Sequence, residues 1–95
     1  MIEETIEKWL FSRGLPADKA SAAAARCEHK LRQGAIPGIS DLTAVRLASD
    51  KPARLIMAIA SGAHFGGDVL SSDPEEDELR AAIEQLAIDQ LKGAY

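Results

Sequence analysis

The chain has 95 residues, 46% of them hydrophobic, and a formal net charge of −4. This length supports one domain with one modest core. Its one cysteine, Cys27, excludes an internal disulfide and is typical of a reducing compartment. Acidic residues near the amino terminus argue against a signal peptide, and the longest apolar run, residues 55–60, is too short to span a bilayer, so we expect a cytoplasmic protein without membrane segments.

Alanine dominates the composition, with seventeen alanines against two valines and two threonines. Helices favour alanine, leucine and long charged side chains, whereas strands favour β-branched and aromatic residues. The composition therefore predicts an all-α fold, a compact single-domain bundle of about five helices over residues 1–95. The helices are expected at about residues 2–13, 16–33, 41–49, 52–64 and 74–92.

The first two predicted helices are separated by a glycine turn. Gly14 is expected to end the first helix in a left-handed conformation, with Leu15 as the apolar residue that follows. Pro16 is expected to begin the second helix, which ends at Gly34. Because the apolar stripe of the second helix is mostly alanine, a neighbouring helix can approach it closely. That stripe consists of Ala20, Ala24, Cys27 and Leu31.

A second stripe on this helix is basic. Lys19, Arg26 and Lys30 lie roughly 100° around the helix from the apolar stripe. Residues 13–54 carry eight Lys or Arg against four Asp or Glu, a net charge of +4, whereas the segments on both sides are acidic. We favour internal pairing of the basic stripe with acidic residues such as Glu75 to Glu78. The alternative is that the stripe binds an acidic partner.

The third and fourth helices follow a turn at Pro37-Gly38. Ser40 is expected to cap the third helix, and Pro52 to begin the fourth. A helix that is apolar on all sides is normally buried, so we place the fourth helix at the centre of the core or of a homodimer. Its apolar residues are Leu55, Ile56, Met57, Ala58 and Ile59.

The last helix follows a long irregular stretch over residues 61–72. Asp73 is expected to cap it, with Pro74 at its first position and Glu76 completing a capping box. Ile88 lies opposite the inward stripe, so we expect it to be exposed and a homodimer to form through the last or the fourth helix. The inward stripe consists of Leu79, Ala82, Ile83, Leu86 and Leu91.

The sequence offers little site chemistry. Cys27 and His29 are two residues apart on a helix and point about 200° from each other, so they do not share a metal ion. His64 and Asp68 are the one base and acid close together in a loop, and we interpret them as part of a turn. We therefore expect no enzyme, no catalytic residues, no metal and no cofactor.

The function that we expect is that of a small non-catalytic protein-binding module, an inhibitor or adaptor of the kind common among mobile-element and phage proteins. The candidate partner-binding residues are Lys19, Arg26, Lys30 and Ile88. The alternative is a DNA-binding regulator, because residues 7–31 resemble a helix-turn-helix in outline and the basic stripe would face phosphates. The negative net charge makes a nucleic acid the less favoured partner.

Overall fold

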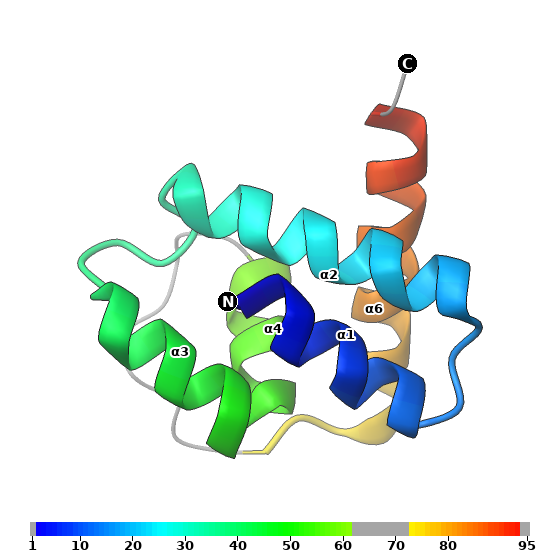
Figure 1. Ribbon diagram of the computed structural model, residues 1–95, viewed down its shortest axis with the longest axis horizontal. Helices are drawn as coiled ribbons and strands as arrows, with labels where there is room; N and C mark the ends of the chain where they lie inside the picture. Colours follow the sequence, from blue (N-terminus) through cyan, green and yellow to red (C-terminus); the bar gives the residue numbers. More distant parts are fainter. Residues whose placement is uncertain (1, 62–72, 94–95) are drawn as a thin grey trace.

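The computed structural model describes residues 2–61 and 73–93, and every regular element in these ranges is an α-helix (Figure 1). The predicted all-α fold is thus confirmed, and the predicted helix boundaries that fall on described residues agree to within a few residues. The predicted end of the fourth helix, at residue 64, lies outside them. The predicted irregular stretch lies outside the described residues, apart from Ser61, which ends a helix. The helices are α1 (Ile2–Ser12), α2 (Ala17–Arg32), α3 (Asp41–Asp50), α4 (Pro52–Ser61) and α6 (Glu76–Gly93).

Glycines end the first two helices as predicted. Gly14 has a φ of +95°, and the N–H of Leu15 donates to the carbonyl of Leu10 over 3.3 Å, which is the closing bond of a Schellman motif. Gly34 repeats the arrangement at the end of α2, with a φ of +88° and a bond from the next residue, Ala35. Other residues would be strained at both glycine positions, so the turns after α1 and α2 depend on glycine.

Local hydrogen bonds also set the corner between α3 and α4. The hydroxyl of Ser40 accepts a bond from the N–H of Thr43 over 3.1 Å and caps α3, as expected. Pro52 is the first residue of α4, so Lys51 alone separates the two helices. The carbonyl of Lys51 accepts the N–H of Leu55 over 3.2 Å. The chain therefore turns sharply without an intervening loop.

The predicted cap of the last helix is wrong. Helix α6 begins at Glu76, and the first helical carbonyl is that of Glu75, which accepts the N–H of Leu79 over 2.9 Å. The carboxylate of Asp73 instead accepts a bond from Nε of Arg54 over 2.9 Å. The carboxylate of Asp73 therefore bonds to the guanidinium of Arg54 on α4 and not to the backbone N–H groups at the start of α6.

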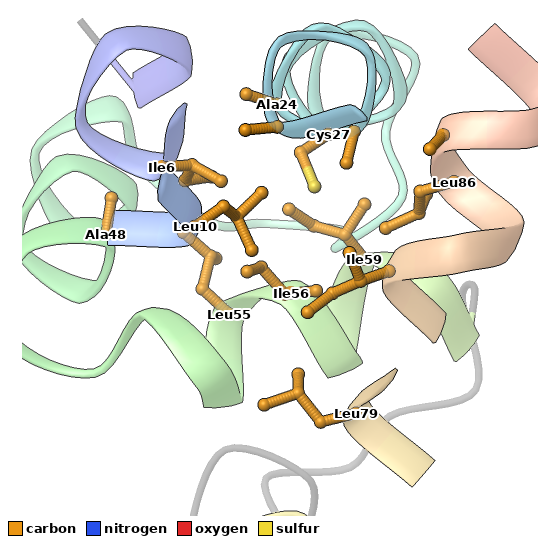
Figure 2. Packing of buried hydrophobic residues seen from close by; sticks show 14 of the residues in the cluster. Ile6, Leu10, Ala24, Cys27, Ala48, Leu55, Ile56, Ile59, Leu79 and Leu86 are labelled. Atoms are coloured by element: carbon orange, nitrogen blue, oxygen red, sulfur yellow. The ribbon is translucent and has the colours of Figure 1, made fainter. Parts of the chain in front are cut away.

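Helix α4 occupies the centre of the core, as expected. Leu55, Ile56 and Ile59 are fully buried, and Figure 2 shows them among side chains of α1, α2 and α6, including Leu10 and Cys27. The helix contacts α2, α3 and α6 within one copy of the chain. Most of its apolar surface is thus covered within one copy, whereas Met57 and Ala60 keep part of theirs, so a dimer contact through α4 stays a prediction.

Helix α2 packs between α1 and α6, and these are the two most extensive contacts between helices in the described structure. Ala20, Ala23 and Ala24 are fully buried, and their small side chains let both neighbours approach closely. Cys27 is fully buried with them, whereas Leu31 lies at the edge of the core and is half-buried. The predicted apolar stripe is therefore confirmed over most of its length.

Candidate functional site

The basic stripe of α2 turns towards α6. Lys19 places its Nζ 3.2 and 3.4 Å from the two carboxylate oxygens of Glu84. Both side chains are about half exposed, at 43% and 48%. The first stripe residue is thus paired within the chain, as the internal interpretation expects, although with Glu84 and not with the acidic turn at Glu75 to Glu78. Helix α2 crosses α6 beyond the first turn of α6, so Glu84 lies within reach of Lys19.

Two further ion pairs join the basic middle of the chain to its acidic last part. Arg13 pairs with Glu76 in the first turn of α6, and its guanidinium lies 4.9 Å from the centre of the Trp9 ring. Arg54 on α4 pairs with Asp73. The sequence pattern did not single out Arg13, because it lies at the end of α1 and outside the basic stripe. An arginine four residues after a tryptophan, a spacing that brings the two side chains together on one face of a helix, is the signal that could have identified it.

The other two stripe residues form no ion pair within the described ranges. Arg26 is half-buried, and its Nε is buried without a hydrogen-bond partner among the described residues. Lys30 is also half-buried and lines a hollow of about 430 Å³ with Met57, Gln85 and Asp89. The three basic residues therefore have three different environments, and they do not form a continuous exposed surface.

The second half of α6 carries exposed apolar residues. Ile88 is 41% exposed, as expected, but Leu91 is 51% exposed, so its predicted inward position is wrong. Figure 1 shows that the end of α6 extends past α2 at the edge of the molecule, where fewer neighbouring residues can cover it. The inward stripe ends at Ala87, which is 2% exposed. Ile88 and Leu91 are three residues apart and lie on neighbouring turns, and we call them the α6 apolar face.

A second exposed apolar pair lies on α3. Leu42 is 69% exposed and Val45 is 46% exposed, again three residues apart on one helix. Val45 lines a hollow of about 270 Å³ with Ile2 and Leu31, so part of its surface is recessed between helices. The sequence pattern did not predict this pair, because α3 is short and its buried residues, such as Ala44, are small.

Cys27 and His29 lie in opposite surroundings. Burial raises the pKa of the Cys27 thiol to about 12, and the nearby Lys30 lowers it only in part. His29 is exposed on the other side of α2. The described residues contain no group of three or more His, Cys, Asp or Glu that could hold a metal ion. His64 and Asp68 lie outside the described residues.

The described residues thus offer exposed apolar side chains on α6 and α3, and the half-buried cation Arg26. The one thiol, Cys27, is buried and unreactive. No helix in the described ranges has the length and hydropathy needed to cross a membrane. In comparisons with known proteins, no protein-family model, no curated protein and no solved structure matches the chain.

Proposed function

We propose that the chain is a small non-catalytic protein-binding module of the cytoplasm, an inhibitor or adaptor that docks through the α6 apolar face. The observation that carries the proposal is the exposure of Ile88 and Leu91 on the part of α6 that extends past α2 (Figure 1). Covering both side chains removes apolar surface from water. The partner is therefore an apolar surface of another protein, wide enough to lie along two turns of a helix.

The contacts of α2 favour a protein partner over DNA. A recognition helix needs a free basic face, but Lys19 is paired with Glu84, and α1 and α6 pack on both sides of α2. The acidic residues of α6 would also repel a phosphate backbone brought against this stripe. A helix-turn-helix regulator therefore remains the second proposal.

A second copy of the chain is a competing occupant of the α6 apolar face. Two copies related by a twofold axis present the same residues to each other, so an apolar face is complementary to itself. We propose that such a homodimer is weak and that a partner protein displaces the second copy, because two side chains are far less than a stable interface buries.

The test compares two matched double variants in a pull-down from lysate of the native host. Ile88→Glu with Leu91→Glu alters the α6 apolar face, and Leu42→Glu with Val45→Glu makes the same changes on α3. We expect the wild type and the α3 variant to recover one common protein after nuclease treatment, and the α6 variant to lose it.

Thermal melts of both variants accompany the pull-down, because the loss of a partner is informative only for a folded protein. All four substituted residues are at least 41% exposed, so we expect small changes in melting temperature. Recovery of the same protein by the α6 variant would overturn the proposed surface. Recovery that disappears with nuclease would favour the DNA-binding alternative.

A further inference from the structure

A polar pocket of about 300 Å³ lies over the outer side of the second half of α2. It is bounded by Glu3 from α1 and by the end of α6, and α2 contributes three basic side chains, Arg26, His29 and Arg32, and the acidic Glu28. The volume suits one small organic acid or one acidic side chain. The pocket lies apart from Ile88 and Leu91, which are not among its lining residues, so the inference does not rest on the α6 apolar face.

Arg26 is the unusual member of this group. Arg13, Arg32 and Arg54 each lie within ion-pair distance of a carboxylate, and Arg46 and Arg80 are exposed to water. Arg26 is half-buried and has neither an ion pair nor a hydrogen bond in the described ranges. Its Nε also has almost no accessible surface in the described structure. A buried donor without an acceptor normally marks an unfilled binding position or a missing solvent molecule. Arg26 therefore lacks an acceptor for its Nε–H. Because Arg26 also lines the pocket, a ligand there can supply one when the guanidinium moves towards it.

The carboxylates in the pocket do not supply that acceptor. Glu28 lies 3.6 Å from Arg32 and is engaged there. Glu3 lines the pocket, but it forms no ion pair with Arg26 in the described structure. The arginine is thus left unpaired in a pocket that already contains two acidic residues.

The charges of the lining select the kind of anion. Arg26 and Arg32 balance Glu3 and Glu28, so the pocket is formally neutral while His29 is neutral. A dianion such as phosphate would be repelled by both carboxylates at close range. A single carboxylate carries half that charge, and its two oxygens match the planar fork of a guanidinium.

We infer that this pocket binds one carboxylate group, with Arg26 as its principal ligand and His29 as a further N–H donor at the rim. The carboxylate belongs to a small organic acid or to an acidic side chain of a peptide. Binding draws the guanidinium towards the pocket and gives its unpaired N–H groups an acceptor. Glu3 limits occupancy to one negative charge.

The test follows the side-chain Nε–H resonance of Arg26 by NMR while sodium acetate is added to the full chain. We expect a saturable shift in the millimolar range that is retained with Arg46→Gln, which removes an exposed arginine on α3. In the Arg26 variants binding is followed through the His29 ring resonances. It should be lost with Arg26→Gln and weaken at least tenfold with Arg26→Lys, which keeps the charge but loses the planar guanidinium.

Two further titrations complete the experiment. A blocked tripeptide with a central glutamate shows whether the bound carboxylate comes from a peptide or from a small organic acid. Tighter binding of the tripeptide than of acetate assigns the pocket to an acidic side chain, whereas equal binding assigns it to a small acid. A linear shift equal to that with sodium chloride would overturn the inference, as would tighter binding of inorganic phosphate than of acetate. Melting temperatures of all variants show whether each remains folded.

Discussion

At the scale of one residue, burial in the alanine-rich core determines the reactivity of the Cys27 thiol. Its side chain is fully buried between helices, and burial raises the pKa of the thiol from 9.0 to about 12. The thiolate is the reactive form of cysteine, so the folded protein keeps this group in its unreactive form at neutral pH. The position therefore contributes to packing, in agreement with the sequence interpretation of an apolar stripe.

The raised pKa predicts a pH dependence of stability. Between about pH 9 and 12 the thiol ionises in the unfolded chain but stays protonated in the folded one, so the free energy of unfolding falls as pH rises. Below pH 9 both states hold the proton, and the effect is absent. Denaturant melts at pH 8 and 10 should show a steeper loss for the wild type than for Cys27→Ala. Equal losses in the two proteins would contradict the assigned burial.

Leu55 is the residue on which we expect stability to depend most directly. It is fully buried on α4, so Leu55→Ala leaves a cavity in the centre of the core. The free energy of unfolding should fall by about 2–5 kcal/mol in denaturant melts. The matched control is Leu42→Ala on α3, where a 69% exposed side chain should cost less than about 0.5 kcal/mol. A loss below about 1 kcal/mol for Leu55→Ala would show that α4 is peripheral.

At the scale of the element, the sequence predicted the helices best where the controlling residues are neighbours in the chain. Gly14, Gly34 and Ser40 act on backbone groups a few residues away, and the structure places all three as expected. Asp73 and Leu91 were predicted wrongly because tertiary contacts decide them. Arg54 donates a hydrogen bond to the carboxylate of Asp73, and Leu91 is exposed on the part of α6 that extends past α2.

The pair of Lys19 and Glu84 tests the packing of α2 on α6. Because both side chains are about half exposed, a double-mutant cycle should give a coupling free energy of about 0–1 kcal/mol, reduced by salt. The charge-swapped protein, Lys19→Glu with Glu84→Lys, should recover most of the stability lost by either single change. Stability losses that simply add in the double variant would show that the two charges do not interact in solution.

At the scale of the whole molecule, the candidate site was only partly predictable. The position of Lys19 and the exposure of Ile88 follow from helical periodicity, and the structure agrees with both. The surroundings of Arg26 depend on where the packing places Glu3 of α1 and the end of α6 beside α2, which no local pattern encodes. The carboxylate pocket therefore emerged only from the tertiary arrangement.

The α6 apolar face also predicts the behaviour of the purified protein. We expect light scattering in the micromolar range to give a mass above the 10.1 kDa of one chain, rising with concentration as copies associate. Leu91→Glu should return the mass to that of the monomer, and Leu42→Glu should leave it unchanged. A monomer mass for the wild type throughout this range would rule out self-association through α6.

The large contact between α2 and α6 has a consequence for synthesis on the ribosome. At roughly 5–20 residues per second, several seconds pass between completion of α2 and completion of α6. During that interval the side of α2 that packs on α6 is exposed, and α4 also lacks its contacts with α6. The nascent chain therefore reaches its final packing only after translation is nearly complete. A chain arrested before Glu76 should be cleaved rapidly by added protease, whereas the released protein should resist it.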